Sequence, residues 1–284
     1  MKIITTISEM QEFSRGARAG GKTIGFVPTM GYLHEGHLSL VRAAREECDI
    51  VVLSIYVNPI QFCAGEDLDK YPRDIERDKA LAEKEGADVI YAPDDGAMYP
   101  AGYATRIEVK AKLINTMCGV SRPGHFIGVT TIVNKLFNIV CPDKAYFGQK
   151  DAQQVVVIKK MVEDLNIPVE IRTMPVVREA DGLAMSSRNS YLSKEERKQA
   201  LGIYRAVKKA EEMIAAGELS ADRIKGEMSV ILREGKDVRI DYIEIVDAGD
   251  LEEVERVNES TLIAIAAHVG KTRLIDNMII ESLS

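Results

Sequence analysis

Short runs of apolar, often β-branched residues alternate with stretches whose apolar residues recur every three or four positions through most of the first 175 residues. The short runs are typical of buried strands, and the three-to-four spacing is typical of amphipathic helices. Their alternation predicts a parallel sheet with crossover helices. Strands are expected at 23–27, 50–57, 88–92, 145–147 and 169–173, with helices at 38–47, 74–85, 129–140 and 152–165.

The pattern changes at about residue 177. Two long, charged amphipathic helices are expected at 194–216 and 221–233, followed by antiparallel strands at 241–247, 261–268 and 273–280. We therefore predict an α/β fold in which residues 1–176 form a parallel-sheet domain with flanking helices and residues 177–284 form a smaller α+β domain. Because ligands of open parallel sheets bind beyond the carboxyl ends of the strands, functional residues are expected directly after them.

Composition narrows the classes of partner. The 284 residues are 46% hydrophobic, enough for a core that needs no metal or disulfide support. A net charge of −7 without a dense Lys/Arg tract disfavours a nucleic-acid partner. The chain start lacks a secretory pattern, and the longest apolar runs, 50–57 and 262–269, are too short to span a bilayer. We expect a cytoplasmic protein without a membrane partner.

Residues 16–23 match the phosphate-binding pattern G-x-x-x-x-G-K-[ST]. A working loop of this type follows a strand and opens a helix. This segment instead follows an expected helix at 8–19 and leads into the strand at 23–27. We interpret it as a helix end and a turn rather than a nucleotide site.

The segment 26–38, F-V-P-T-M-G-Y-L-H-E-G-H-L, is the strongest candidate site. A strand ends in a Pro/Gly turn, and a helix then opens with His34 and His37, three residues apart on one face. Backbone N–H groups and the helix dipole attract phosphate at such a position, and imidazoles can donate to charge that develops on a triphosphate. A surface His pair and a partial metal site are the alternatives, but H-E-x-x-H and a third ligand are absent.

Three further clusters follow expected strands. Asn58 and Gln61 carry neutral amides that can bind hydroxyl or carboxylate groups. Residues 148–154, G-Q-K-D-A-Q-Q, supply a turn glycine, the cation Lys150 and another helix start. Residues 182–189, G-L-A-M-S-S-R-N, hold two hydroxyls and Arg188, which suit a mobile phosphate clamp. Each alone is more often a loop, but their shared position after strands favours one site.

The H-x-G-H turn with the later M-S-S-R run is similar to the paired signatures of the nucleotidylyltransferase superfamily. More narrowly, the chain resembles the pantothenate synthetase family, through motifs spread from Phe26 to Asn277. These are P-T-M-G-x-L-H-E-G-H, V-N-P-x-Q-F, Y-P-R-D, S-R-P-G-H-F, F-G-x-K-D-x-Q-Q, D-G-L-A-M-S-S-R-N-x-Y-L and R-L-I-D-N.

The resemblance implies ATP-dependent condensation of (R)-pantoate with β-alanine through a pantoyl-adenylate, with release of AMP and pyrophosphate. It also implies a Rossmann-like first domain, a second domain that acts as a lid, a homodimer, and Mg²⁺ on the triphosphate with Asp78 as a candidate ligand. His37, as general acid, His34 and Lys150 would be catalytic. Gln61 and Gln154 would hold pantoate, with Gln61 also near β-alanine, and Asn58 would be a further substrate-binding residue. The ATP site would comprise Met30, Gly31, Tyr32, Leu33, His34, Glu35, Gly36, His37, Gly148, Gln149, Lys150, Asp151, Val177, Met185, Ser186, Ser187 and Arg188.

Three other functions would share part of this pattern. A nucleotidylyltransferase that uses a phosphorylated acceptor would need extra cations where the neutral Gln61 and Gln154 are expected. A tRNA-charging enzyme is disfavoured by the acidic balance and the missing anticodon-binding extension. A nucleotide sensor that binds ATP without turnover would release no pyrophosphate in the presence of ATP and pantoate.

Overall fold

The computed structural model describes residues 1–110 and 112–283, and it divides into two units. The first unit comprises Met1–Lys110, Arg122–Gly148 and Val157–Met174. The second comprises Ala111–Ser121, Gln149–Val156 and Pro175–Ser284. Two short segments from the middle of the chain therefore belong to the same unit as its end.

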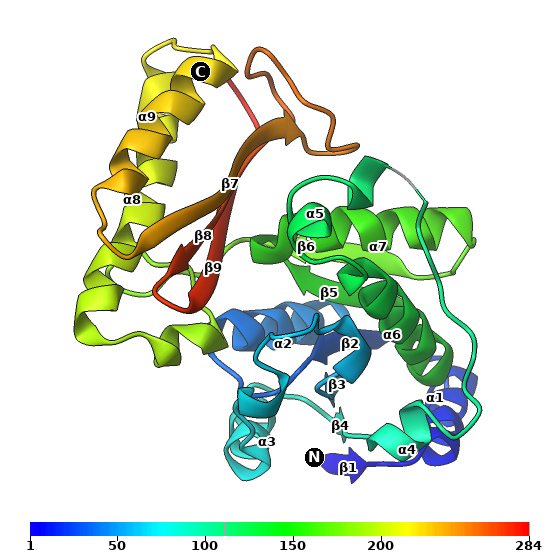
Figure 1. The fold of residues 1–284 in the computed structure, drawn as a ribbon. Coiled ribbons are helices and arrows are strands. Elements are labelled where there is room, and N and C mark those ends of the chain that lie inside the picture. Colours follow the sequence, from blue (N-terminus) through cyan, green and yellow to red (C-terminus); the bar gives the residue numbers. More distant parts are fainter. Residues whose placement is uncertain (111, 284) are drawn as a thin grey trace. The chain divides into compact units, whose positions relative to one another are not determined.

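The first unit is built on a six-stranded parallel sheet (Figure 1). Its strand order is β1-β4-β3-β2-β5-β6, so the direction in which strands are added reverses between β2 and β5. In sheets of this kind a crevice forms where the order reverses. The strands are β1 (Lys2–Ile4), β2 (Ile24–Thr29), β3 (Ile50–Ile55), β4 (Val89–Tyr91), β5 (Lys144–Gly148) and β6 (Glu170–Met174).

Helices cover both faces of this sheet. On one face the ring of Phe26 in β2 packs edge-on against Phe137, with centroids 6.4 Å apart. On the other face, Val27 and Leu53 join a buried cluster with Val41. The helices of this unit are α1 (Ile7–Ala19), α2 (Glu35–Glu47), α3 (Ile75–Lys84), α4 (Asp95–Met98) and α6 (His125–Val140), with short 3₁₀ turns at Pro59–Gln61 and Leu68–Lys70. Helix α7 (Ala152–Asp164) is divided between the two units, and α5 (Cys118–Ser121) with the 3₁₀ turns at Lys112–Ile114 and Gln149–Asp151 belongs to the second.

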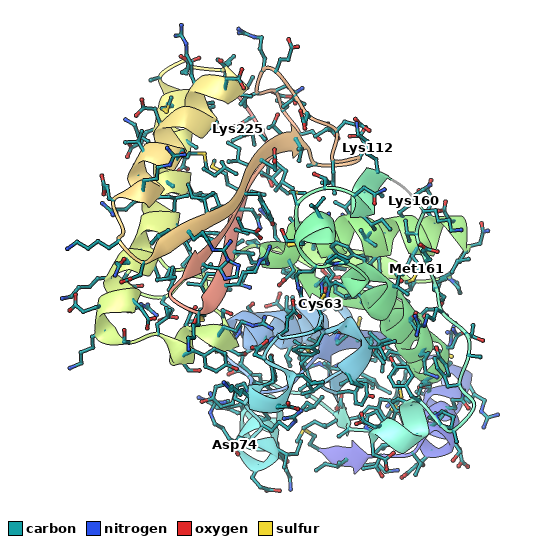
Figure 2. The ribbon with its side chains drawn as sticks, viewed as in Figure 1. Cys63, Asp74, Lys112, Lys160, Met161 and Lys225 are labelled. Carbon is teal, nitrogen blue, oxygen red and sulfur yellow. The ribbon has the colours of Figure 1, made fainter. Side chains whose placement is uncertain are left out.

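Helix α7 shows how the hydrophobic pattern is used. Figure 2 labels the adjacent residues Lys160 and Met161. Met161 is buried, whereas Lys160 pairs with Asp164 at 2.7 Å one turn further along. One face of the helix therefore packs and the opposite face carries an i,i+4 ion pair. Among the described residues, no helix is long and apolar enough to cross a membrane.

The second unit holds a three-stranded antiparallel sheet in the order β7-β8-β9 with two long helices. Ala206 of α8 and Ile224 of α9 are fully buried in one cluster with Ile263 and Ile265 of the central strand. Ser193 and Glu196 form a capping box at the start of α8. The elements are a 3₁₀ turn at Ser187–Tyr191, α8 (Lys194–Ala215), α9 (Ala221–Arg233), β7 (Val238–Asp247), β8 (Thr261–Val269) and β9 (Thr272–Ile280).

The expected α/β fold is confirmed, with each expected strand and helix present. The structure adds the edge strand β1, which at three residues is too short for a periodicity to be visible. Three elements begin three or four residues earlier than predicted: α2 at Glu35, α6 at His125 and β7 at Val238. In α2 and α6 the first turn contains glycine and histidine, so the apolar repeat that marks the rest of the helix starts late.

Candidate active site

The turn after β2 is held in an unusual backbone conformation. Gly31 and Tyr32 both have positive φ, 81° and 50°. A Cβ atom at Gly31 would lie 2.8 Å from Cγ2 of Ile55, so only glycine fits. The Thr29 hydroxyl accepts from the Gly31 N–H at 3.1 Å and donates to the Ser54 carbonyl at 2.8 Å, which ties the turn to β3. Together these contacts fix the chain direction into α2.

Asp78 of α3 braces the same turn. Its two carboxylate oxygens accept hydrogen bonds from the N–H groups of Tyr32, at 2.6 Å, and Leu33, at 2.7 Å. The side chain is only 1% exposed, and burial raises the pKa of this carboxyl although the two N–H donors oppose the rise. Asp78 therefore serves as the anchor of the turn. Its assignment as a Mg²⁺ ligand stays a prediction.

His34 and His37 stand at the start of α2, as the sequence predicts. His34 is the N-cap residue and His37 lies one turn on; their rings stack with centroids 4.0 Å apart. Nδ1 of His37 accepts a hydrogen bond from the His34 backbone N–H at 3.3 Å. In the neutral ring the proton is then carried by Nε2, so His37 presents an N–H donor. The positive end of the α2 dipole adds to the attraction of this position for anions.

The amide of Gln61 is oriented by two neighbours. Asn58, which is buried, donates through Nδ2 to Oε1 of Gln61 at 3.0 Å, and the Tyr99 hydroxyl donates to Oδ1 of Asn58 at 2.7 Å. Since its oxygen is engaged, the amide is oriented with its NH₂ group toward Met30, and Nε2 donates to Sδ of Met30 at 3.0 Å. The structure thus brings together the first two clusters that the sequence singled out, as donors at neighbouring strand ends.

A glycine in α6 makes room for this loop. At Gly128 a Cβ atom would lie 2.4 Å from the Ile60 carbonyl oxygen and 2.5 Å from Cα of Gln61. The Gly128 carbonyl also accepts from Nδ2 of Asn58 at 3.1 Å. Glycine inside a helix costs roughly 1 kcal/mol relative to alanine, and here the cost is offset by close packing of the Gln61 loop on the helix.

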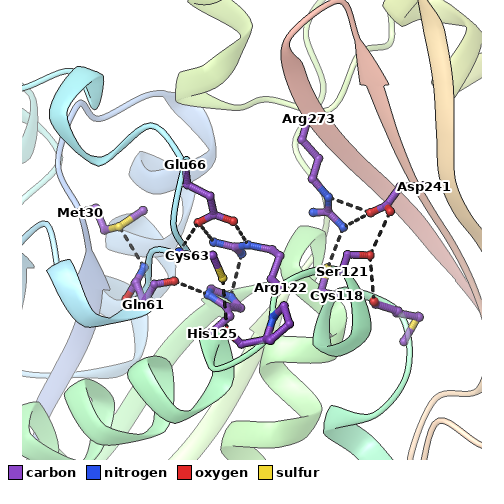
Figure 3. A network of polar contacts seen from close by, with 12 residues as sticks. Met30, Gln61, Cys63, Glu66, Cys118, Ser121, Arg122, His125, Asp241 and Arg273 are labelled. Carbon is purple, nitrogen blue, oxygen red and sulfur yellow. Dashed lines mark hydrogen bonds and ion pairs between the residues drawn. The ribbon is translucent and has the colours of Figure 1, made fainter.

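A charged network supports the Gln61 backbone (Figure 3). Nδ1 of His125 lies 2.8 Å from the Gln61 carbonyl, and Nε2 lies 2.9 Å from Nη1 of Arg122. His125 is thus a neutral ring that donates through Nδ1 and accepts at Nε2. Arg122 also donates to both oxygens of Glu66, at 2.5 and 2.8 Å. Burial, the largest single influence, raises the pKa of Glu66, but the hydrogen bonds and charge of Arg122 together with the backbone N–H of Cys63 outweigh it, and the net shift is downward.

A cleft of about 350 Å³ opens beside the turn after β2. Its carboxylates are already held: Asp74 and Asp94 cap α3 and α4 by accepting from backbone N–H groups at 3.1 and 2.7 Å, and Asp95 accepts from the Tyr56 hydroxyl at 2.8 Å. Such a lining repels phosphates and carboxylates. The charged lining residues are Arg73, Asp74, Asp78, Asp94 and Asp95.

In the second unit, Lys150 sits in the 3₁₀ turn Gln149–Asp151 that leads into α7. Its side chain is 21% exposed, and Nζ lies 3.8 Å from a carboxylate oxygen of Asp151. Gln154 is half-buried in the first turn of α7. Its neighbour Gln153 has a structural task, because its amide contacts the backbone of residues 113, 116 and 118 at 2.7 to 2.9 Å.

The M-S-S-R run follows a tight hairpin of the second unit. Met185 donates through its backbone N–H to the Val177 carbonyl at 2.9 Å, and Arg178 pairs with Ala184 as an antiparallel bridge. The Ser186 hydroxyl accepts from the Arg188 N–H at 3.3 Å and so caps the following 3₁₀ turn. Val177 and Met185 are thereby neighbours, although eight positions apart.

The false phosphate loop has the expected context. Helix α1 ends at Ala19, Gly20 is its C-cap, and β2 begins at Ile24. Across residues 1–110 and 112–283, no group of three or more His, Cys, Asp and Glu side chains is placed to hold a metal ion. The sequence motifs gave no role to five residues that the structure shows in supporting contacts: Tyr99, Arg122, His125, Asp276 and Asn277. Two of the recognised motifs, S-R-P-G-H-F and R-L-I-D-N, contain four of them.

Comparison with known proteins fits this arrangement. The family described as pantoate-beta-alanine ligase matches residues 2–279. A pantothenate synthetase of Thermotoga petrophila is 58% identical over 280 residues, covering 99% of this chain and all of that protein. One from Caldicellulosiruptor bescii is 56% identical over 282 residues, with the same coverage.

Two solved structures are also similar. The pantothenate synthetase of Thermus thermophilus has a TM-score of 0.93 and 44% identity over 99% of this chain and all of that one. The pantoate-beta-alanine ligase of Francisella tularensis, complexed with beta-gamma ATP and beta-alanine, has a TM-score of 0.83 and 34% identity over 99% of this chain and 98% of that one. The chain belongs to the pantoate–β-alanine ligase family.

Proposed function

We propose that this chain condenses (R)-pantoate with β-alanine at the expense of ATP, through an enzyme-bound pantoyl-adenylate. The observation that carries the proposal is the pair of donors at neighbouring strand ends of the first unit. Nε2–H of His37 lies at a helix N-terminus, and the NH₂ group of Gln61 is aimed by Asn58. One suits a phosphate, and the other suits an uncharged hydroxyl or a single carboxylate.

The first half-reaction joins two anions, which repel each other. A pantoate carboxylate oxygen attacks the α-phosphorus of ATP, the bond to the β-phosphate breaks, and pyrophosphate leaves. His37 donates to the charge that accumulates on the phosphates, and His34 and Lys150 contribute further positive or polar contacts. Gln61 and Gln154 orient pantoate by hydrogen bonds, so that positioning rather than charge selects the acid.

The second half-reaction forms the amide. The β-alanine nitrogen attacks the acyl carbon of the adenylate, AMP departs with the former carboxylate oxygen, and the nitrogen loses a proton. An acyl-adenylate hydrolyses readily, so water must be excluded until the amine arrives. We propose that the second unit serves as the lid and that the remaining residues of the predicted ATP site, 30–36, 148–151, 177 and 185–188, bind the nucleotide.

Mg²⁺ is expected as the counter-ion of the triphosphate. Within the described residues no preformed cluster of ligands exists, and both Asp78 oxygens already accept backbone hydrogen bonds. The fit is therefore that of an ion held mainly by phosphate oxygens and water, as is common for Mg²⁺. The homodimer and the cytoplasmic location remain expectations from the family.

The neutral environment of Gln61 disfavours a phosphorylated acceptor. Its side chain meets Asn58 and Met30, and the nearby guanidinium of Arg122 is paired with Glu66. A phosphate group would need an unpaired cation there. A nucleotide sensor would place the same donors around ATP but would not need a substrate-orienting amide.

Exchange of labelled pyrophosphate into ATP tests the mechanism. With Mg-ATP and pantoate alone, the enzyme should catalyse exchange, and added β-alanine should convert the bound intermediate to pantothenate and AMP. Formation of ADP and phosphate would indicate an acyl-phosphate route. Exchange that requires β-alanine would indicate a concerted reaction, and absence of turnover with bound ATP would indicate a sensor.

A further inference from the structure

Two consecutive polar residues of β9, Asp276 and Asn277, are buried in the second unit. They are 1% and 3% exposed, and they belong to the R-L-I-D-N motif. Asp276 pairs with Ile265 and Asn277 with Ala264 of the central strand β8, within its apolar stretch 262–267. A carboxylate and an amide are costly to bury unless their hydrogen-bonding groups find partners. Their partners therefore indicate what they are for.

Asn277 holds the backbone of the Lys150 turn, residues 149–151. Its Nδ2 donates to the carbonyl oxygens of Gln149, at 3.0 Å, and Lys150, at 2.9 Å. Its Oδ1 accepts from Nε2 of Gln149 at 3.3 Å. One side chain thus contacts the turn at three points. Because the carbonyl of Lys150 is fixed, the Cα from which the lysine side chain extends is fixed as well.

Asp276 holds the hairpin before the M-S-S-R run. It accepts two parallel hydrogen bonds from Arg178, at 2.6 and 3.0 Å, the bidentate geometry that fixes both direction and distance. Arg178 also donates to the Gly182 carbonyl at 3.2 Å, and its guanidinium lies 5.0 Å from the centre of the Tyr204 ring. Arg178 itself forms an isolated antiparallel bridge with Ala184, directly before Met185.

Charge favours the same arrangement. Burial raises the pKa of Asp276, and the rise is opposed by Arg178, by the Asn277 backbone N–H at 2.8 Å and by the charge of Lys150. The carboxylate therefore interacts with Arg178 in the hairpin before the M-S-S-R run and with the charge of Lys150. Because the two polar side chains are adjacent on one rigid strand, that strand holds both segments in place.

We propose that Asp276 and Asn277 are positioning residues for the nucleotide-binding part of the second unit. Asn277 sets the Lys150 turn, and Asp276 sets Arg178 and the hairpin that leads into Met185–Arg188. Neither is assigned contact with a substrate. The inference rests on the proposed role of Lys150 in ATP binding, and it gives the R-L-I-D-N motif a task.

Asn277→Ala tests the proposal by isothermal titration with Mg-ATP. The substitution removes both donors to the turn, and we expect ATP binding to weaken about tenfold, as for loss of one hydrogen bond between Lys150 and a charged group. Asn258→Ala is the control for an asparagine elsewhere in the same unit, because Asn258 is exposed and its side chain accepts from the Thr261 hydroxyl at 3.0 Å rather than from the Lys150 turn. The control should bind ATP as the parent chain does.

A double-mutant cycle with Lys150→Ala separates positioning from general destabilisation. If Asn277 acts through Lys150, Asn277→Ala should weaken ATP binding far less in the Lys150→Ala background than in the parent. Urea unfolding reports stability in parallel, and where the alanine variant is too unstable to titrate, Asn277→Ser, which keeps a donor, replaces it in the cycle.

Three results would overturn the inference: unchanged ATP affinity in the folded Asn277 variant, additive effects in the cycle, or unchanged ATP affinity in Lys150→Ala alone. The titration needs no turnover. A parent chain that binds ATP but forms no pantothenate would refute the proposed function while the cycle still decided the role of Asn277.

Discussion

The Tyr99 hydroxyl is the outermost member of the hydrogen-bond chain that aims Gln61, and Tyr99→Phe removes it alone. The hydroxyl donates to Oδ1 of Asn58 at 2.7 Å, and Asn58 in turn donates to Gln61. Burial raises the pKa of Tyr99, so the group stays a donor at all ordinary pH values. Phenylalanine keeps the ring and its edge-on contact with Tyr103, with centroids 5.1 Å apart.

The expected magnitude follows from the loss of the hydrogen bond that the side-chain oxygen of Asn58 accepts. Its oxygen is buried, and loss of the donor costs about 1 to 3 kcal/mol of the free energy of unfolding. A flip of the amide offers no escape, because the oxygen would then face Oε1 of Gln61 and the Gly128 carbonyl. If the poorer orientation of Gln61 weakens pantoate binding by the free energy of one neutral hydrogen bond, KM for pantoate should rise about twofold to tenfold.

Two measurements check this prediction. Urea unfolding gives the stability change, and steady-state kinetics with each substrate varied in turn gives the KM values. Tyr103→Phe is the control, since Tyr103 lies in the same aromatic cluster but outside the chain of hydrogen bonds to Gln61. The reasoning is refuted if Tyr99→Phe keeps both its stability and its KM for pantoate, or if only KM for ATP rises.

Three further predictions concern other parts of the chain. His37→Ala should lower kcat by about 100-fold or more, as loss of one preorganised donor does, and a folded variant with near-normal kcat would remove His37 from the mechanism. Lys22→Ala should keep its affinity for ATP in a titration while Lys150→Ala loses it. The reverse result would mean that residues 16–23 bind the phosphates of ATP. Glu47→Gln should destabilise the chain by about 1 kcal/mol at neutral pH, after allowance for solvent screening. Hydrogen bonding from Lys144 lowers the pKa of Glu47 from 4.5 to about 2, so the parent chain has this stabilisation above pH 4.5 and loses it as pH falls through 2. The urea midpoint of the parent should fall across this pH window, and the variant should lack this part of the fall.

The local pattern of apolar and polar residues was sufficient to predict the parallel sheet and the strand-end positions of His37 and Gln61. Buried strands are short apolar runs, and the turns after them are marked by Pro, Gly and polar residues, so both signals lie within a few positions of each other. The His pair could be placed on one face of a helix from its spacing alone. Neither step required knowledge of distant parts of the chain.

The supporting contacts could not be predicted in this way. Asp78 braces a turn 46 positions away, and Gly128 is small because a loop 67 positions earlier packs on it. Asp78 looks like an available carboxylate in the sequence, and only the structure shows that backbone N–H groups occupy it. The sequence around a buried polar side chain does not show which distant group is its partner, whereas a buried apolar side chain contributes to a repeat that is visible in the sequence.

The division of the chain between its two units has a consequence for how the protein is made. The segments 111–121 and 149–156 belong to the second unit, and Cys118 and Gln149 contact β9 at sequence separations of 155 and 128. On the ribosome these segments emerge long before β9 does. Contacts between distant positions form slowly, and domains of large proteins generally fold in order of synthesis. The second unit, although two of its segments are made early, cannot be completed until translation has nearly ended, and a chain stopped before β9 leaves the Lys150 turn without its anchor.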